Sequence, residues 1–105
     1  MKNGERVVVL RPKEIDWIEA DDDYVHLHVG QESHILRSTL AELEQRLAGE
    51  GFVRIHRSRL VNLNCIKEFH ALFHGESVVI LKSGVRLSAS QSCLRALQDR
   101  LHATR

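Results

Sequence analysis

Basic side chains crowd into one short stretch in the second half of the chain. Residues 54–59 contain Arg54, His56, Arg57 and Arg59, and apolar segments flank them on both sides. A guanidinium group can bind phosphate oxygens in a forked geometry, or it can bind O6 and N7 of guanine in the major groove. A solvated hairpin end has the same composition. This stretch, the basic corner, therefore indicates either a contact with nucleic acid or an exposed basic turn.

Three histidines form a second group with possible chemistry. His26 and His28 fall on one face of a predicted strand, and His34 lies on a segment that can return as its hairpin partner. Three imidazoles on one hairpin can hold Zn²⁺ with an open fourth position. The same spacing arises when histidines simply line the wet face of a sheet, which is the favoured interpretation. A small His-rich metal-binding domain stays open as an alternative, and no cofactor is expected.

Catalytic signatures are absent from the sequence. The carboxylates Asp21–Asp23 are adjacent, whereas a Ca²⁺ loop alternates its ligands and carries glycine at a set position. Ser58 is close to His56 in the sequence, but this nearness is no evidence of a nucleophile–base pair. Cys65 and Cys93 lack Cys-x-x-Cys spacing and fit reduced thiols better than a disulfide framework. We therefore expect that the protein is not an enzyme.

Short strand patterns dominate the first part of the chain. Strands are predicted over residues 7–10 and 15–20, on either side of a turn around Pro12. Residues 24–29 alternate strictly, with Val25, Leu27 and Val29 on one face, and residues 34–36 can return after Gly30.

One short helix is predicted inside this β pattern. Leu40, Leu43 and Leu47 have the spacing of an apolar helical stripe, and Thr39 with Glu42 matches a capping box. The helix should stop at residues 49–51, where Gly49 and Gly51 tolerate a left-handed conformation.

The second half returns to strands. They are predicted over residues 52–55, 60–63, 66–73, 77–81 and 85–89, and a final amphipathic helix is predicted from about Ser90 to the end. Alternation along the first of these strands points Val53 and Ile55 inward and leaves Arg54 and His56 outward, with Arg57 and Arg59 in the turn.

The length and the charge distribution of the chain limit its possible fold and partners. A chain of 105 residues with 43% hydrophobic and 28% charged residues predicts one globular domain over 1–105, with 1–5 as a flexible tail. No apolar run reaches the ~20 residues of a membrane span, so no membrane contact and a cytoplasmic location are expected. Residues 1–50 hold six Lys/Arg against eleven Asp/Glu, a net charge of −5, whereas residues 51–105 hold nine against three, a net charge of +6. The basic half favours a polyanionic partner.

Several segments together resemble LytTR-type DNA-binding domains of bacterial response regulators. The resemblance is carried by residues 15–20 followed by Tyr24-Val25, by residues 37–40, by residues 52–58 running into 60–62, and by residues 84–88 with Ser90. It covers about residues 7 to 101. It implies a mainly β fold of about ten short, mostly antiparallel strands in an elongated shape, with one short internal helix.

The same resemblance implies that loops enter the DNA major groove. In the family the contacts come from three places, which correspond here to Asp23-Tyr24, His56-Arg57-Ser58 and Ser90-Gln91. Arginine is common in the family where this chain has Gln91. The candidate DNA contacts are Arg57 and Gln91 for base discrimination, together with His56, Arg59, Arg54, Ser58, Tyr24, Ser90 and Lys67.

The expected function is therefore sequence-specific binding of double-stranded DNA in bacterial transcription regulation. The resemblance implies pairs of domains on direct repeats, and an upstream receiver or sensor domain if the chain is an excised fragment. A nearby phosphate would favour protonated His56, so binding is expected to tighten as the pH falls. Besides the metal-binding reading, a protein-interaction module with a basic face remains the other alternative.

Overall fold

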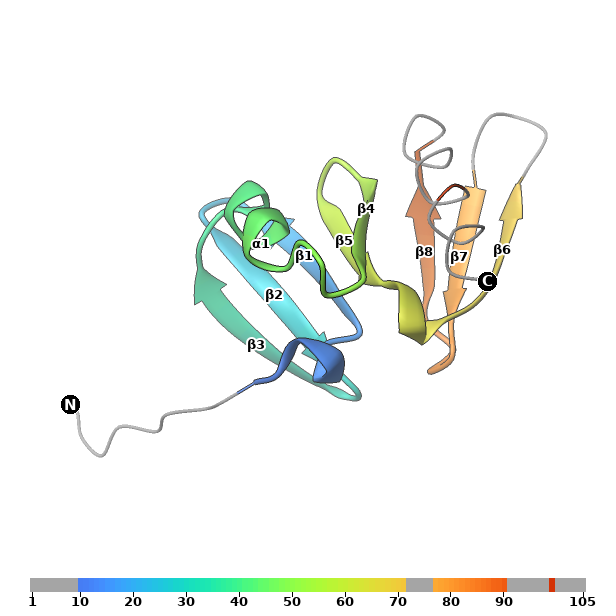
Figure 1. Cartoon of the computed structure of the whole chain (residues 1–105), viewed down its shortest axis with the longest axis horizontal. Coiled ribbons are helices and arrows are strands. Elements are labelled where there is room, and N and C mark those ends of the chain that lie inside the picture. Colours follow the sequence, from blue (N-terminus) through green and yellow to red (C-terminus); the bar gives the residue numbers. More distant parts are fainter. Residues whose placement is uncertain (1–9, 72–76, 91–98, 100–105) are drawn as a thin grey trace.

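Eight strands and one α-helix make up the fold in the part of the chain that the structure describes. The computed structural model describes residues 10–71, 77–90 and 99. In chain order the elements are a 3₁₀ turn η1 (Pro12–Glu14), β1 (Trp17–Asp21), β2 (Tyr24–Val29), β3 (Glu32–Arg37), α1 (Leu40–Arg46), β4 (Phe52–His56), β5 (Arg59–Asn62), a 3₁₀ turn η2 (Leu63–Cys65), β6 (Ile66–Ala71), β7 (Ser77–Leu81) and β8 (Arg86–Ala89) (Figure 1). The mainly β expectation with one internal helix is confirmed.

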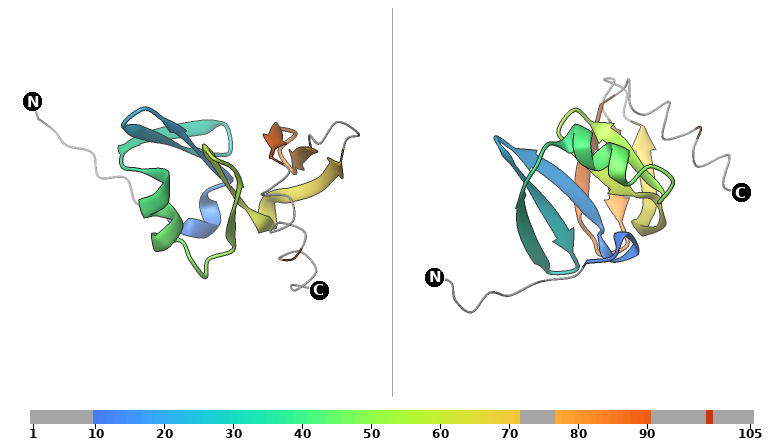
Figure 2. Two further views of the ribbon diagram at one scale, coloured as in Figure 1. Left: turned by 90° about the horizontal axis from the view of Figure 1, so that it is seen from above. Right: turned by 60° about the vertical axis from the view of Figure 1, so that its left-hand side comes forward.

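The strands form two antiparallel sheets. The larger sheet has the order β3-β2-β1-β5-β4, and the smaller has the order β6-β7-β8. Figure 2 shows α1 and η1 on the same side of the larger sheet, with the smaller sheet beyond β4 and β5.

The β2–β3 hairpin follows the predicted alternation. Val25 and Leu27 are buried, and Val29 pairs with Glu32 across a two-residue turn. Gly30 has φ 61°, which lies in the left-handed region that suits glycine at a tight turn. The hairpin register therefore follows directly from this turn.

The helix α1 forms as its capping box predicts. The hydroxyl of Thr39 accepts a hydrogen bond from the backbone N–H of Glu42 at 3.1 Å, and the Glu42 carboxylate accepts one from the N–H of Thr39 at 3.2 Å. Leu40, Leu43 and Leu47 are all buried, as expected, and pack against the larger sheet. This packing makes the first of two apolar clusters.

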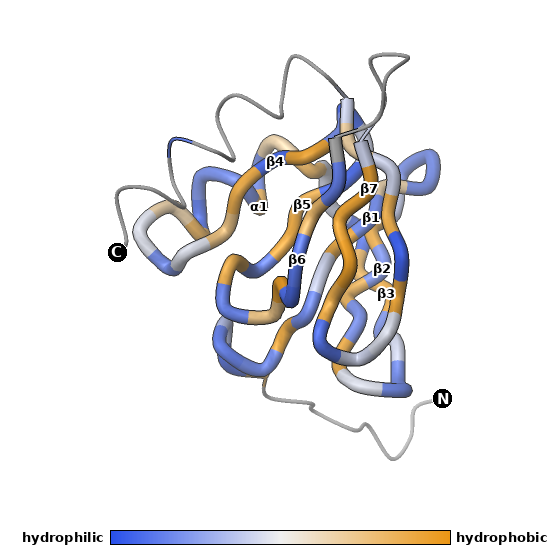
Figure 3. The backbone as a smooth tube through the Cα atoms, turned by 90° about the vertical axis from the view of Figure 1, so that its right-hand side faces the viewer, coloured by the Kyte–Doolittle hydropathy of each residue, from blue (hydrophilic) through white to orange (hydrophobic). Residues whose placement is uncertain are grey.

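A second apolar cluster joins the two sheets. It lies on the opposite face of β5 from the first, because Leu60 belongs to the first cluster and its neighbour Val61 to the second. Its other fully buried side chains include Ile55 of β4 and Val79 of β7. Figure 3 shows long hydrophobic stretches along β4, β5 and β7. The position of the smaller sheet therefore depends on this cluster.

Some of the predicted elements differ from the structure or fall outside it. The strand predicted over residues 15–20 begins only at Trp17, because Pro12–Glu14 form η1 and Ile15 caps that turn. The predicted strand over 7–10 and nearly all of the final helix lie outside the described residues, so eight strands are described where about ten were expected. Within the described ranges, no helix is long and apolar enough to cross a membrane.

Candidate nucleic-acid interface

Three segments that are distant in the sequence meet at one edge of the molecule. The N–H of Ala20 donates to the carbonyl of Ser58 at 2.8 Å, which ties the end of β1 to the β4–β5 turn. The N–H of Ser90 donates to the carbonyl of Ile55, also at 2.8 Å, which ties the end of β8 to the end of β4. This loop edge, formed by residues 22–24, 56–58 and 90, lies along the top of Figure 1. It brings together the described residues of the three predicted contact segments, of which only Ser90 represents the third.

A β-bulge separates the basic side chains of β4. Arg54 lies opposite Leu60, whereas His56 lies opposite Arg59, so two steps along β4 match one step along β5. Neighbouring residues of β5 point to opposite faces, and Arg54 and His56 therefore do so as well. The prediction that Arg54 and His56 share the outward face is wrong for this reason, whereas the predicted burial of Val53 and Ile55 is confirmed.

Arg54 is engaged within the protein. Its Nη2 lies 2.9 Å from a carboxylate oxygen of Glu44 on α1, and its Nη1 donates to the carbonyl of Arg57 at 2.9 Å. The Nε of Arg54 is buried, and no acceptor lies within reach among the described residues. Arg54 thus links the helix to the turn and fixes the backbone from which the Arg57 side chain projects.

His56 and Ser58 are hydrogen-bonded across the turn. The backbone N–H of Ser58 donates to Nδ1 of His56 at 3.3 Å, and the hydroxyl of Ser58 lies 3.0 Å from the same nitrogen. Both side chains are half-buried. These contacts close the turn on itself and hold the imidazole in place.

The two arginines that follow differ in exposure. Arg57 lies in the turn and is exposed. Arg59 was also predicted in the turn, but it is the first residue of β5 and is half-buried, which corrects that prediction. Its Nη1 lies 3.5 Å from the carbonyl of Ser88 on β8, and its Nε is buried without an acceptor among the described residues. Arg59 therefore spans the junction between the sheets, while Arg57 faces solvent.

The β1–β2 turn brings negative charge to the same edge. Asp21, Asp22 and Asp23 are exposed, and Asp22 has φ 61°, a conformation that aspartate tolerates better than most residues. Tyr24 follows the turn with 45% of its surface exposed. The carboxylate of Asp21 is 3.2 Å from Nε2 of His26. Asp22 and Asp23 stay uncompensated by any ion pair that the described residues make.

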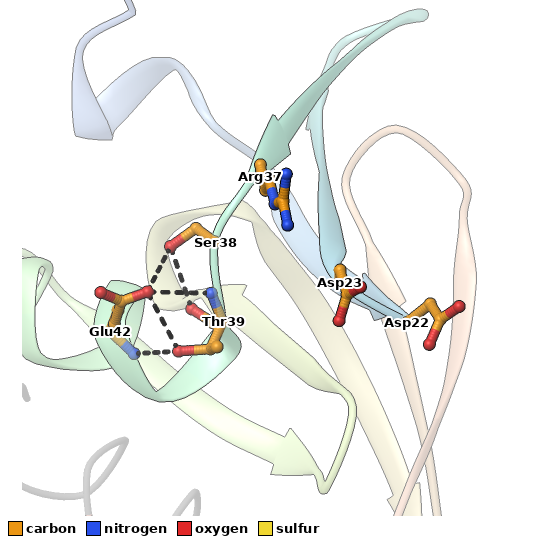
Figure 4. Close-up of a pocket in the computed structure, with 6 residues that line it drawn as sticks. All are labelled: Asp22, Asp23, Arg37, Ser38, Thr39 and Glu42. Atoms are coloured by element: carbon orange, nitrogen blue, oxygen red, sulfur yellow. Dashed lines mark hydrogen bonds between the residues drawn. The ribbon is translucent and has the colours of Figure 1, made fainter.

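Arg37 is a residue of this edge that the sequence analysis did not single out. It pairs with Tyr24 across the β2–β3 hairpin and is exposed. Counting outward from the tight turn at Gly30 would have found it, because Val29 and Glu32 pair there. Arg37 also lines a solvent-open hollow with Asp22, Asp23, Ser38, Thr39 and Glu42 (Figure 4).

The far wall of this hollow is a closed set of hydrogen bonds. One carboxylate oxygen of Glu42 accepts from the N–H of Thr39 and from the hydroxyls of Ser38 and Thr39, at 3.1–3.3 Å. The hydrogen bond from the Thr39 backbone, followed by the one from Ser38, lowers the pKa of Glu42 from its ordinary value of 4.5. Glu42 is thus committed to capping α1.

Three other predicted site residues differ in how they relate to the loop edge. Ser90 is half-buried and lies next to the basic corner. Gln91 lies outside the described residues. Lys67 is exposed near the start of β6, next to Ile66, which pairs with Leu81. Ala71, at the other end of that strand, pairs with Ser77, and Ser77 pairs with Ala89, the residue before Ser90 of the loop edge. At ~3.3 Å per residue, the four-residue separation places Lys67 roughly 13 Å from that edge.

The histidines do not converge on a metal site. His26 and His28 do share a face, with ring centroids 6.4 Å apart, but His34 pairs with Leu27 and therefore points to the opposite face. His28 stacks on Trp17 at 4.0 Å and contacts Glu19 at 3.0 Å. Across residues 10–71, 77–90 and 99, no three His, Cys, Asp or Glu side chains are grouped so that they could hold a metal. The alternative in which His34 approaches the other two is wrong, because this register places it on the opposite face.

Cys65 is a structural thiol. Its Sγ lies 3.5 Å from a carboxylate oxygen of Asp16, and burial, followed by the charge of Asp16, raises the pKa of the thiol to about 11. A thiol with so high a pKa is a poor nucleophile at neutral pH, in line with the reduced state predicted for it.

Comparisons with known proteins agree on one family. The family model of the LytTr DNA-binding domain matches residues 5–102. The sensory transduction protein LytT of Bacillus subtilis is 30% identical over 94% of this chain, and the transcriptional regulatory protein YpdB of Escherichia coli is 27% identical over 93%. The solved LytTr DNA-binding domain of a Bacillus cereus response regulator superposes with a TM-score of 0.82 at 25% identity, covering 95% of this chain and 92% of that one.

The extent of these matches differs between the two kinds of relative. The chain spans only 41% of the length of the Bacillus subtilis protein and 40% of the Escherichia coli protein, whereas it matches nearly all of the solved domain. The shared unit is thus the domain. This chain belongs to the LytTr DNA-binding domain family.

Proposed function

We propose that this chain, as a single domain over residues 1–105, binds specific double-stranded DNA sequences on behalf of a bacterial transcription regulator. The observation that carries the proposal is the pair of main-chain hydrogen bonds, from Ala20 to Ser58 and from Ser90 to Ile55, which assemble the loop edge. Family membership supplies the class of ligand, and the loop edge supplies a place for it.

Loops are better suited than a helix to enter the major groove. Among the described residues the one α-helix has seven residues, and its apolar face is buried against the sheet. Its solvent-facing side chains include Glu42, whose charge would repel phosphate, and Glu44, which is paired with Arg54. The loop edge instead carries the exposed guanidinium of Arg57, and a groove about 12 Å wide can admit such a turn.

The candidate contacts divide by their chemistry. Arg57 and Gln91 read base edges, and Tyr24, Ser90 and Arg37 reach the backbone beside them. Arg59 contributes positive charge from the sheet junction, and His56 and Ser58 shape the turn. Arg54 acts through Arg57, since it binds the carbonyl of that residue. Lys67 is the weakest candidate because of its distance from the loop edge.

The rest of the regulator is assigned by analogy with the relatives. Since the chain spans about two fifths of those sensory and regulatory proteins, we infer that a receiver or sensor domain precedes it in a longer protein or acts with it. Two copies on direct repeats would lie head to tail. The setting is the cytoplasm, where the DNA is, and the role is binding rather than catalysis.

Selection from a random duplex library, followed by gel shift on the winning sequence, tests the proposal. A recurring sequence, bound more tightly than its scrambled version by at least about 1,000-fold, is the expected result for a specific DNA-binding protein. Binding that ignores sequence, or binding to a protein partner that survives nuclease treatment, would favour the protein-interaction alternative instead.

A further inference from the structure

We propose that Ser58 holds His56 as the neutral tautomer with its proton on Nε2, so that His56 presents one fixed N–H donor to DNA. The inference rests on the proposed function, because the acceptor that it assigns belongs to a duplex. It gives Ser58 a positioning role and His56 a defined hydrogen-bonding role.

The tautomer follows from the donors that face Nδ1. A backbone N–H can only donate, and that of Ser58 points at Nδ1 of His56 from 3.3 Å. The hydroxyl of Ser58, 3.0 Å from the same atom, can donate as well. A proton on Nδ1 would place two N–H groups face to face. The ring therefore keeps a lone pair on Nδ1 and its single proton on Nε2.

The charged side chains near the ring offer no competing acceptor for a proton on Nδ1. Arg59 lies directly across from His56 on β5, and Arg57 follows it in the turn. Neither guanidinium group can accept a hydrogen bond, so neither offers a partner to a proton on Nδ1. On β1, Glu19 pairs with Arg59 in the strand register, and its carboxylate is bound to His28 at 3.0 Å. On the β8 side the neighbouring residues are Ser88 and Ser90, which carry no charge.

A neutral Nε2–H has defined acceptors on DNA. It can donate to a phosphate oxygen, or to N7 or O6 of a purine in the major groove. Protonation of the imidazole would break the contact from the Ser58 backbone N–H, reverse the hydrogen bond with the Ser58 hydroxyl, and displace the turn that carries Arg57. DNA affinity should therefore fall as the pH drops below neutral. This replaces the expectation, drawn from sequence, that a phosphate would favour protonated His56 and tighten binding.

The tautomer can be observed without DNA. Two-bond ¹H–¹⁵N correlation spectra of the ¹⁵N-labelled chain at pH ~8 distinguish the nitrogen that carries the proton, and the His56→Gln spectrum identifies the signals among the seven histidines. The expected result is an Nε2–H tautomer. An Nδ1–H tautomer, or two tautomers in rapid exchange, would overturn the inference and leave the proposed function intact.

Two substitutions distinguish the roles of Nδ1 and Nε2 of His56 in DNA binding. In His56→Gln the amide nitrogen falls near the position of Nε2 and does not titrate, whereas in His56→Asn the amide reaches only the position of Nδ1. His56→Gln should bind the selected duplex within about threefold of wild type, and His56→Asn should lose roughly tenfold, the value of one charge-assisted or well-placed hydrogen bond. Equal losses in the two variants would contradict the donor role.

The pH profile supplies the final arm. Between pH ~8 and ~6, wild-type affinity should fall by about threefold or more relative to the affinity of His56→Gln. The control is His34→Gln, which changes a histidine on β3 outside the loop edge and should keep the wild-type pH profile. Ser58→Ala should weaken binding and increase exchange between tautomers, and Ser58→Thr should restore both. A wild-type affinity that rises over this pH range by the same factor as that of His56→Gln would overturn the proposal. Failure of the wild type to bind any duplex would overturn the proposed function itself.

Discussion

Ser90 donates its main-chain N–H to the carbonyl oxygen of Ile55 at 2.8 Å, and this bond joins the two sheets at the loop edge. Ile55 is the extra residue of the β4 bulge, and its side chain is fully buried in the cluster between the sheets. One residue thus anchors the smaller sheet and holds the backbone of Ser90, the residue after β8. The relative position of the candidate DNA contacts therefore depends on packing at the junction as well as on the loops.

Asn62→Ala should destabilise the fold at the base of this arrangement. Asn62 is 1% exposed, and its side chain donates to the carbonyl of Ile15 and accepts from the N–H of Asn64, both at 3.0 Å. Alanine would remove the buried donor to the Ile15 carbonyl and the acceptor of the Asn64 N–H, at a cost of about 1–3 kcal/mol in the free energy of unfolding. Urea titration measures this loss. Asn64→Ala, at an exposed position whose backbone contact persists, is the control and should differ little from wild type.

Asp22→Asn should strengthen DNA binding. Asp22 is an exposed carboxylate at the loop edge, and asparagine tolerates its φ of 61° equally well. Removing a charge that repels phosphate is worth up to about 1 kcal/mol, or roughly fivefold in affinity at low salt. Fluorescence anisotropy at two salt concentrations measures the gain, which should shrink as salt rises. Glu50→Gln removes a charge after α1, before the start of β4, and should leave affinity unchanged; an equal gain there would mean that the effect reflects net charge alone.

Glu42→Gln should change how stability depends on pH. Because the hydrogen bond from Thr39, followed by that from Ser38, lowers the pKa of Glu42 below 4.5 in the folded chain, ionised Glu42 stabilises the fold above that pH. This contribution disappears as the pH falls through the lowered pKa. Wild type should therefore have the higher Tm at pH ~6, and the two melting curves should converge at pH ~3. A difference in Tm that stays constant over this range would contradict the assigned cap.

Gln91→Arg should alter one position of the preferred DNA site. Glutamine offers one donor and one acceptor, which match N6 and N7 of adenine, whereas arginine offers two donors that match guanine. Library selection with both proteins should shift that position from adenine, or from weak preference, to guanine. The position read by Arg57 should not change. Identical selected sites would mean that residue 91 does not face a base.

Local patterns were sufficient to predict the hairpin and the helix. Strict alternation over residues 24–29 gave β2, and Thr39 with Glu42 gave the start of α1, because a turn and a capping box need only neighbouring residues. The basic corner was found from its own composition, the resemblance added the other two contact segments, and the structure places Tyr24, His56–Ser58 and Ser90 at one edge.

Features that depend on distant contacts were not predictable in this way. The β4 bulge at Ile55 accompanies a hydrogen bond from Ser90, which lies 35 residues later in the numbering. Without the bulge, Arg54 and His56 would share a face, as alternation predicts. His34 was misplaced because a hairpin register decides which face a residue occupies, and a shift of one residue reverses it. Arg54 was expected to contact DNA, but its partner Glu44 comes from a helix ten residues earlier.

Library selection with Arg57→Ala, compared with Arg59→Ala and with Lys82→Ala as the control, tests the central claim most directly. Arg57 is exposed at the tip of the turn, whereas Arg59 lies at the sheet junction and Lys82 follows β7 at the end away from the loop edge. Arg57→Ala should lose about 1–3 kcal/mol on the best duplex and should relax the preference at one base pair. Arg59→Ala should weaken binding similarly on all sequences, and Lys82→Ala should change neither affinity nor preference. An unchanged site with unchanged affinity in Arg57→Ala would contradict the assignment of the loop edge as the surface that reads DNA.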